Sequence, residues 1–425
     1  MAPERNTSNV TAKSPEAGIV AMAVNLRPPD ELLPVPGVRV GSACAGIKQT
    51  ERDDIALFHF VSGTQIAGVY TQSHFAAAPV LLARARQSQS RAWVVNSGNA
   101  NAATGEVGGE DAQAVCAQAG RLLRVSAEQV QPFSTGVIGE RLPVEKMNSA
   151  LHQASASLID TGWLAAAQAI MTTDTLPKGV SARIVVGGVN VTITGIAKGS
   201  GMIKPNMATM LAYMACDACV GDGVADMLVR DAVAHSFNRI TVDGDTSTND
   251  CFMLACSGQA GNPVIDGRGH PDYATLAAAI TELATSLAQN LVRDGEGATK
   301  FVTVHVAGAA SAEDCLAIAY TVAESPLVKT ALFAGDANWG RFCMAIGRAP
   351  VAELDANQVQ LWLDDVQVAE NGLMSSSYTE ADGAAVLAQD EFTISIRVGP
   401  GTAQETVWTT DLSYDYVRIN AEYRT

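Results

Sequence analysis

The sequence is poor in charged and aromatic residues and contains no long apolar run. Charged residues make up 17% of the chain and aromatic residues 5%, whereas an average soluble protein is about 25% charged. The best candidate for a membrane-spanning stretch, Ala208–Val220, is interrupted by Asp217 and falls short of roughly 18 apolar residues. The N-terminal segment lacks the apolar core of a signal peptide and does not resemble an Arg-rich transit peptide. We therefore expect a cytoplasmic protein with no membrane partner.

Histidine and cysteine are not arranged as ligands of a metal ion. The six histidines are scattered, and the eight cysteines do not form the framework of a small secreted domain. One Cys-x-x-Cys pair, Cys216 and Cys219, suggests a redox or zinc site, but no second pair and no nearby histidine pair accompanies it. We interpret both residues as ordinary buried thiols. We expect no metal site, and any nucleophile must find a base other than histidine.

The charge balance is strongly acidic. Asp and Glu total 44 against 28 Lys and Arg, so the formal net charge is −16. Nucleic acids and anionic membranes select basic surfaces, so neither is an expected partner. A chain of 425 residues predicts two or three domains at about 150 residues per domain. Such a chain can bury a sizeable core without disulfide or metal staples.

Strand-like and helix-like segments alternate along the chain after a polar tail at residues 1–17, which we expect to be flexible. Ala182–Val186 and Val189–Ile196 are joined by Gly187-Gly188, which supplies the positive φ angles of a tight hairpin turn. Hairpins indicate antiparallel or mixed sheets, so the sequence predicts an α+β layered fold rather than a doubly wound one. Further strands are expected at Gln65–Thr71, Ala92–Asn96, Phe301–Val306, Val359–Leu363, Phe392–Val398 and Thr406–Leu412, and helices at Glu110–Leu123, Leu164–Met171, Val224–Phe237, Tyr273–Val292 and Ala312–Val322.

Several segments are rich in glycine and small polar residues. Lys198–Lys204 contains only a fragment of a Walker A pattern, and no Gly-x-Gly-x-x-Gly opens a predicted helix. Asn96–Asn101 and Gly244–Asp250 are typical of surface turns. They fit equally well as loops that line a polar pocket, and the residues alone leave both interpretations open.

The most informative segment is the glycine-loosened loop that leads into an apolar strand at Thr209. A threonine hydroxyl is a poor nucleophile unless the residue is N-terminal, because its free α-amine, with a pKa of about 8, then acts as the base. Self-cleavage between Ala208 and Thr209 would create that amine and leave two fragments of nearly equal length. From composition alone, however, a threonine that opens a strand needs no functional explanation.

The segment Lys198-Gly-Ser-Gly-Met-Ile-Lys-Pro-Asn-Met-Ala-Thr209-Met-Leu resembles the self-cleavage signature of the ornithine acetyltransferase (ArgJ) family. The resemblance runs from about residue 20 to the last residue. Further motifs that carry it, in the same order, are Asn96–Asn101, Ser134–Gly139, Met171–Asp174, Thr241–Asp250, Gly335–Arg341 and Asn420–Thr425.

The resemblance implies an enzyme of arginine biosynthesis that moves an acetyl group from N2-acetyl-L-ornithine to L-glutamate through an acetyl-threonyl intermediate. It implies an αββα sandwich, the layering of ArgJ and DmpA proteins, similar to that of N-terminal-nucleophile hydrolases. It also implies an α chain of residues 18–208 and a β chain of residues 209–425 that stay together, usually as an α2β2 heterotetramer. No cofactor is implied. Many members also use acetyl-CoA to acetylate glutamate, and the sequence does not decide whether this chain accepts acetyl-CoA.

The resemblance also assigns roles to individual residues. Thr209 matches the nucleophile, and Thr135 and Gly136 match the oxyanion-hole pair. The positions that hold the substrate are Thr172, Lys198, Thr209, Glu296, Asn420 and Thr425, with Thr173 as an alternative to Thr172. Lys and hydroxyl groups suit the α-carboxylate that ornithine and glutamate share, and Glu296 is a candidate partner for the side-chain amine of ornithine.

Two other function classes are compatible with these residues. A self-processing aminopeptidase of the same architecture would use the same kind of nucleophile to hydrolyse amides. A purely binding protein would never cleave itself. The intact C-terminal Asn420–Thr425 motif and the Lys198 motif favour the transferase.

Overall fold

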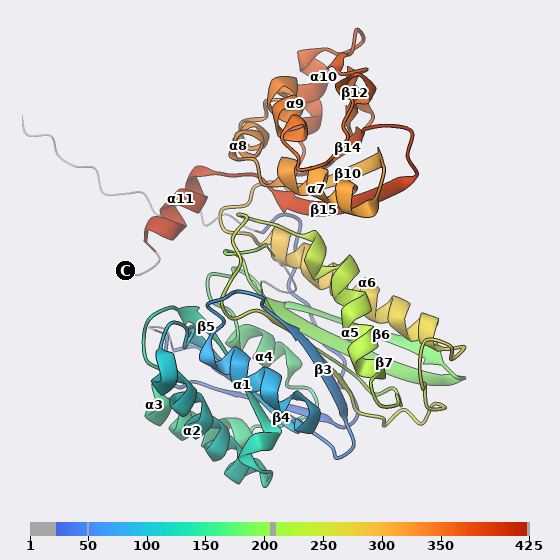
Figure 1. Cartoon of the computed structure of the whole chain (residues 1–425). Helices are drawn as coiled ribbons and strands as arrows, with labels where there is room; N and C mark the ends of the chain where they lie inside the picture. Colours follow the sequence, from blue (N-terminus) through green and yellow to red (C-terminus); the bar gives the residue numbers. More distant parts are fainter. Residues whose placement is uncertain (1–22, 49–50, 205–209, 423–425) are drawn as a thin grey trace, which may run out of the picture.

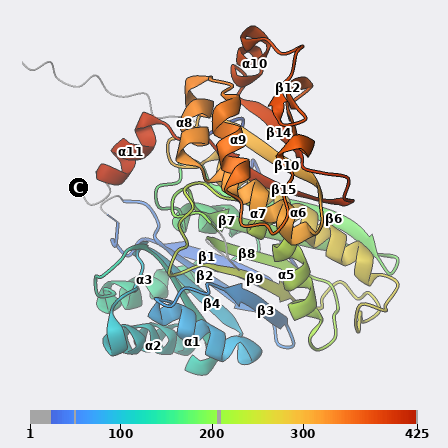
Figure 2. The ribbon, with the colours of Figure 1, turned by 45° about the horizontal axis from the view of Figure 1, so that its top comes forward.

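The computed structural model describes residues 23–48, 51–204 and 210–422, and these form two lobes (Figure 1). The first lobe contains strands β1 to β9 and helices α1 to α6, and the second contains β10 to β15 and α7 to α10. The last helix, α11 (Tyr414–Ala421), leaves the second lobe and lies apart from the sheet of that lobe in both ribbon views (Figures 1 and 2).

Two mixed sheets form the centre of the first lobe. The first sheet has the order β1-β2-β4-β5, in which β4 and β5 are parallel. The second has the order β3-β9-β8-β7-β6, in which β8 and β9 are parallel. The strands are β1 (Val38–Ala43), β2 (Ile55–Phe60), β3 (Gln65–Tyr70), β4 (Ala92–Asn99), β5 (Val130–Val137), β6 (Lys178–Val186), β7 (Val189–Lys198), β8 (Leu211–Cys216) and β9 (Cys251–Cys256).

The hairpin that the sequence predicts at Gly187-Gly188 is confirmed. β6 pairs antiparallel with β7, and Val186 lies opposite Val189. Gly187 has a φ of 56° and Gly188 a φ of 82°, which matches a tight turn whose two central residues both need positive φ.

Helices cover the outer faces of both sheets, so the predicted αββα sandwich is confirmed. Residues of α2 and α3 pack against β1, β2 and β4 of the first sheet. Residues of α5 and α6 pack against the outer face of the second sheet. The helices of this lobe are α1 (Ala78–Arg86), α2 (Gly105–Leu123), α3 (Val144–Ala156), α4 (Trp163–Ala169), α5 (Val224–His235) and α6 (Tyr273–Arg293).

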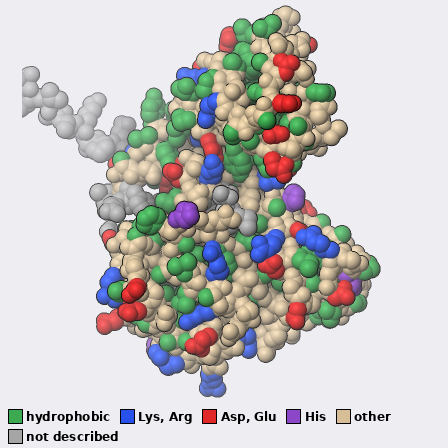
Figure 3. Space-filling model, in the orientation of Figure 1, with side chains coloured by type: hydrophobic (Ala, Val, Ile, Leu, Met, Phe, Trp, Pro, Cys, Tyr) green, Lys and Arg blue, Asp and Glu red, His purple; other side chains and the backbone are tan. Residues whose placement is uncertain are grey.

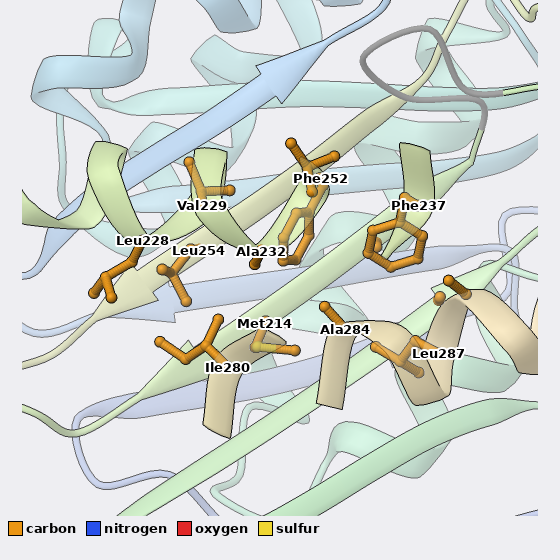
Figure 4. Close-up of a cluster of buried hydrophobic side chains, with 14 of the residues drawn as sticks. Met214, Leu228, Val229, Ala232, Phe237, Phe252, Leu254, Ile280, Ala284 and Leu287 are labelled. Atoms are coloured by element: carbon orange, nitrogen blue, oxygen red, sulfur yellow. The ribbon is translucent and has the colours of Figure 1, made fainter. Parts of the chain in front are cut away.

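Strand alternation supplies side chains to both interfaces of the sandwich. Between the sheets, the ring of Tyr213 on β8 lies 5.5 Å from those of Phe58 and Trp93 on the first sheet. The next residue, Met214, points the other way and packs with Phe252, Ile280 and Leu287 under α5 and α6 (Figure 4). These buried apolar contacts hold β8 between the other sheet and the outer helices.

The second lobe has its own core, which the sequence did not predict as a separate unit. Its sheet has the order β13-β12-β11-β14-β10-β15, and α7 to α9 pack on it around Phe342 and Ile394. The elements are β10 (Phe301–Ala309), α7 (Ala312–Ala323), α8 (Pro326–Ala334), α9 (Trp339–Gly347), β11 (Gln360–Leu363), β12 (Val366–Glu370), β13 (Leu373–Met374), α10 (Glu380–Leu387), β14 (Glu391–Arg397) and β15 (Ala403–Thr410).

The structure shows where the cysteines and the surface charges lie. Cys216 is buried with its Sγ 3.5 Å from that of Cys256, whereas Cys219 is half-buried, and both residues are free thiols. Within the described ranges, no three His, Cys, Asp or Glu side chains are grouped as metal ligands. On the face shown in Figure 3, Lys and Arg side chains are scattered among acidic and polar ones.

No single helix in the described parts of the chain is long and apolar enough to cross a membrane. The two helices α7 and α8 pass the test of length and composition only when taken together, and they are bent by 58° at their junction.

Candidate active site

A cavity of about 280 Å³ opens where the ends of β5 and β7 meet the loop after α6 and the helix α11. Its lining includes six of the residues that the sequence assigned to the site: Thr135, Gly136, Thr172, Lys198, Glu296 and Asn420. These residues come from segments up to 285 positions apart in the chain (135 to 420), so the fold brings them together.

Thr135 and Gly136 lie at the end of β5, where that strand approaches β4 very closely. Gly136 pairs with Gly98 in the parallel register and has a φ of 132°. A Cβ atom at position 136 would lie 2.3 Å from the carbonyl carbon of Gly98. Only glycine fits there, because a side chain would clash with the neighbouring backbone and strain its own.

Lys198 is the last residue of β7, and its side chain bridges the two sheets. Its Nζ donates hydrogen bonds to Thr172 Oγ1 at 2.7 Å and to Thr135 Oγ1 at 3.2 Å. The residue is only 8% exposed. The ammonium group therefore lies between the proposed oxyanion hole and the segment after α4, with a hydroxyl on either side.

The surroundings of Lys198 pull the pKa of its ammonium group in opposite directions. Burial lowers the pKa, and the carboxylate of Asp174 is the largest opposing influence. Nearby carboxyl groups of Asp250 and Glu296 also favour the charged form, whereas Lys178 disfavours it. The net shift is downward, so an anionic ligand that binds here supplies part of the stabilisation that burial removes.

Glu296 faces the cavity from the loop that follows α6. The residue is 8% exposed, and its Oε2 accepts a hydrogen bond from Asn420 Nδ2 at 2.8 Å. A Cβ atom at position 201 would lie 2.4 Å from the same carboxylate oxygen, so Gly201 provides the room that Glu296 occupies. No salt bridge to Glu296 is present among the described residues, which leaves its carboxylate able to pair with a cationic ligand.

α11 carries Asn420 to the rim of the cavity. The helix begins at its N-cap Ser413, whose Oγ donates a hydrogen bond to the carbonyl of Gly297 at 2.6 Å. Farther along, Tyr416 Oη lies 3.4 Å from an oxygen of Asp243, and Asp243 also accepts from the backbone of Met202 at 2.6 Å. These contacts tie the C-terminal helix to the loops of the first lobe.

The remaining residues that the sequence assigned to the site fall in two groups. Ala208, Thr209 and Thr425 lie outside the described residues, so their assigned roles stay predictions. Thr172 and Thr173 both line the cavity, but only Thr172 is bonded to Lys198, whereas the hydroxyl of Thr173 lies 2.6 Å from that of Ser200.

Two further residues of the cavity wall were not singled out from the sequence. Asn249 and Asp250 lie in one of the polar loops whose role was left open, and both line the cavity. Asn249 Nδ2 donates to the carbonyls of Ala100 and Ser134, so it links this loop to the end of β4 and to β5, beside Thr135 and Gly136. Burial raises the pKa of Asp250 well above its usual range, and the nearby ammonium group of Lys198 opposes that shift.

The arrangement has the parts that acyl transfer to an amino acid requires. A hydroxyl beside a glycine at a strand end can hold an oxyanion. A buried ammonium can bind an α-carboxylate, and a carboxylate can bind an amine. None of the described lining residues is a histidine, so the base for a nucleophile must be a group of another kind.

Comparisons with known proteins give a consistent result. A model of the ArgJ family matches residues 39–425. The chain is 52% identical over 405 residues to the arginine biosynthesis bifunctional protein ArgJ of Pseudomonas fluorescens, and 51% identical to the protein of that name from Pseudomonas syringae. Each alignment covers 95% of this chain and 100% of the relative.

Solved structures of similar sequence cover about half of the chain. One is the arginine biosynthesis bifunctional protein ArgJ of Bacillus halodurans, with 37% identity, 49% of this chain, 96% of that chain and a TM-score of 0.47. Another is the ornithine acetyltransferase of Mycobacterium tuberculosis complexed with ornithine, with 31% identity, 41% of this chain, 94% of that chain and a TM-score of 0.37.

Proposed function

This chain belongs to the ArgJ family, and on that premise we propose that it moves an acetyl group from N2-acetyl-L-ornithine to L-glutamate in arginine biosynthesis. The observation that carries the proposal is the pairing of opposite charges in one cavity. Lys198 suits the α-carboxylate that both amino acids share, and Glu296, without a salt-bridge partner among the described residues, suits the side-chain amine of ornithine.

We propose that Thr209 is the nucleophile and that its α-amine, released by self-cleavage after Ala208, is the base. The hydroxyl oxygen attacks the acetyl carbonyl, and the oxyanion that forms is stabilised by Thr135 and Gly136. The amide C–N bond then breaks, and the ornithine nitrogen leaves with the proton taken from the threonine hydroxyl. The α-amine of glutamate attacks the resulting ester, which forms N-acetylglutamate and restores the free hydroxyl of Thr209.

We propose that Thr172, Asn420 and Thr425 complete the substrate pocket with Lys198 and Glu296. The hydrogen bond from Lys198 to Thr172 supports Thr172 rather than Thr173 as the contact. No cofactor has a part in these steps. The two Pseudomonas relatives are named bifunctional proteins, and we propose that this chain also accepts acetyl-CoA as an acetyl donor for glutamate.

We propose that the α chain (18–208) and the β chain (209–425) stay together after cleavage and assemble as an α2β2 heterotetramer in the cytoplasm. The pairing of β7 with β8 supports the first step, because these neighbouring antiparallel strands lie on opposite sides of the proposed cleavage bond. Their hydrogen bonds and the shared core would hold the two chains together.

The test is a product assay with two acetyl donors. The purified protein is incubated with N2-acetylornithine and glutamate, and separately with acetyl-CoA and glutamate, while ornithine and N-acetylglutamate are quantified by mass spectrometry. We expect ornithine and N-acetylglutamate to form in equal amounts in the first reaction. Release of ornithine and free acetate at the same rate without glutamate would instead identify a hydrolase, the alternative that the relatives do not favour.

A further inference from the structure

A buried network of three charged groups lies behind the wall of the cavity. Lys178 Nζ lies 2.6 Å from Asp174 Oδ1 and 2.6 Å from Asp294 Oδ2, and the exposed fractions of the three side chains are 0%, 0% and 1%. The partners come from three separate segments: the stretch after α4, the start of β6, and the loop that follows α6. Two carboxylates and one ammonium leave a net negative charge at this point.

Asp174 reaches beyond this network to the residues that line the cavity. Its Oδ2 accepts a hydrogen bond from the backbone N–H of Thr172 at 2.9 Å. Its Oδ1 accepts one from the backbone N–H of Gly199 at 2.8 Å. One buried carboxylate therefore holds the backbones of Thr172 and of Gly199, the residue after Lys198. The side chains of Thr172 and Lys198 are themselves joined by a hydrogen bond of 2.7 Å.

Asp294 contacts Lys178 equally closely but has different neighbours. Its carboxylate accepts from the backbone N–H and the hydroxyl of Thr175, and it makes no hydrogen bond to Thr172, Lys198 or Gly199 among the described contacts. The two aspartates thus share burial and the same cationic partner, while only Asp174 contacts the segments that carry Thr172 and Lys198.

The charge of Asp174 also acts on Lys198. Burial alone would raise the pKa of Asp174, but the ammonium groups of Lys178 and then Lys198 bring it well below its usual range. In return, Asp174 is the largest influence that favours the charged form of Lys198. The charged and titratable groups that face Lys198 from the surrounding elements are Lys48, Asp174, Lys178, Asp250 and Glu296.

We propose that Asp174 is a positioning residue of this site, which aligns Thr172 and Lys198 by holding the backbone N–H groups of Thr172 and Gly199 and keeps the Lys198 ammonium charged for binding the α-carboxylate of the substrate. The inference rests on the proposed function, because it takes the ligand of Lys198 to be an amino-acid carboxylate. It predicts that loss of the negative charge weakens binding of both substrates and narrows the pH range of activity.

The first variant is Asp174→Asn, which keeps the shape but removes the charge and one of the two acceptors. Lys198 then loses its strongest favourable influence, its pKa falls further, and the cation is lost at a lower pH. We expect KM for acetylornithine and for glutamate to rise on the order of tenfold. The alkaline limb of kcat/KM should move to lower pH by about one unit or more.

The matched control is Asp294→Asn, which removes a carboxylate from the same ammonium at the same depth. We expect a comparable fall in melting temperature, while the alkaline limb stays at its wild-type position. Intact mass must first show that every variant has cleaved to the same extent as the wild type, so that only processed enzyme is compared. An equal shift of the limb in Asp294→Asn, or unchanged KM and pH dependence in Asp174→Asn, would overturn the proposal.

A second variant separates charge from alignment if Asp174→Asn does not fold. Asp174→Glu keeps the charge but displaces the acceptor oxygens, so KM should rise while the alkaline limb stays in place. A shift of the alkaline limb of kcat/KM to lower pH in Asp174→Glu would also contradict the role of the charge. Failure of the proposed function is seen separately, as a wild-type enzyme that forms no N-acetylglutamate from acetylornithine.

Discussion

Under the proposed function, single residues divide the cavity into a half suited to a carboxylate and a half suited to a cation. Lys198 and Thr172 form the first, and Glu296 with Asn420 forms the second. The two substrates share the α-carboxylate but differ at the end of the side chain, where ornithine carries an amine and glutamate a carboxylate. Binding of the two should therefore respond differently to a change in charge at Glu296.

Glu296→Gln removes the negative charge by replacing the carboxylate with an amide of about the same size. We expect KM for acetylornithine to rise on the order of tenfold, because the charged amine loses its counter-charge. KM for glutamate should stay the same or fall, because the repulsion of its side-chain carboxylate is relieved. Steady-state kinetics measure both constants, and the exposed Glu106→Gln on α2 is the control for the change of residue type. A parallel rise of both KM values would contradict the assignment.

Gly136→Ala tests the close approach of β5 to β4. The added methyl group would meet Gly98 at 2.3 Å and force a positive φ on alanine, so we expect a loss of about 2 kcal/mol or more in the free energy of unfolding. Acetyl transfer should fall by about 10²-fold or more if the oxyanion position moves. Gly139→Ala is the control, since it has a positive φ but nothing within 4 Å of the added atom. If Gly136→Ala had the same free energy of unfolding in urea and the same kcat as Gly139→Ala, the close fit at position 136 would be contradicted.

At the scale of elements, the sandwich supplies the sides of the cavity and α11 supplies its rim. β5 and β7 end beside each other, and Lys198 Nζ donates a hydrogen bond to Thr135 Oγ1 across the gap between their sheets. α11 has no buried residue of its own and is held by its N-cap Ser413, by Tyr416 Oη against Asp243, and by Asn420. Because none of its residues is buried, loss of its C-terminal end should have little effect on the core.

Deletion of residues 420–425 tests the role of this rim. Self-cleavage should be largely intact, because it is expected to depend on Thr209 and the local oxyanion donors. KM for both acetylornithine and glutamate should rise by about tenfold or more, because Asn420 and the predicted contact of Thr425 are lost. Gel analysis reports the cleavage and steady-state kinetics report the binding. Wild-type kinetics in the truncated protein would show that these residues lie outside the site.

The sequence predicted the elements well wherever a local pattern determines them. The Gly-Gly turn between β6 and β7 and the apolar period of α6 are visible in a few neighbouring residues. Strands β10, β11, β14 and β15 were predicted as single segments, but their grouping into a second lobe was not, because β10 pairs with β14 and β15, which lie far along the chain. The network of Lys178 was also missed, since Asp294 lies 116 positions away and no local signal joins the two.

At the scale of the whole molecule, the proposed cleavage divides the first lobe and leaves the second lobe entirely in the β chain. β8 and β9 of the β chain lie between β7 and β3 of the α chain in one sheet. Neither fragment can therefore keep this sheet alone, and the two chains should behave as one folded unit. The cavity would also need both chains, because the proposed cleavage places Lys198 and Glu296 on different ones.

Cleavage should yield fragments of 208 and 217 residues, counted from residues 1–208 and 209–425. We expect two bands on a denaturing gel, and N-terminal sequencing of the second should begin Thr-Met-Leu-Ala. Thr209→Ala should remain one chain without activity, whereas Thr209→Ser should still process because a hydroxyl is kept. A fully active single chain of 425 residues would refute self-cleavage.

The most direct test of the account is the mass of the β chain after incubation with N2-acetylornithine in the absence of glutamate. The account predicts a gain of one acetyl group, located on the N-terminal Thr209 peptide and lost when glutamate is added, with N-acetylglutamate formed in equal amount. A β chain of unchanged mass, with ornithine released only when both substrates are present, would contradict the acetyl-threonyl intermediate and with it the proposed mechanism.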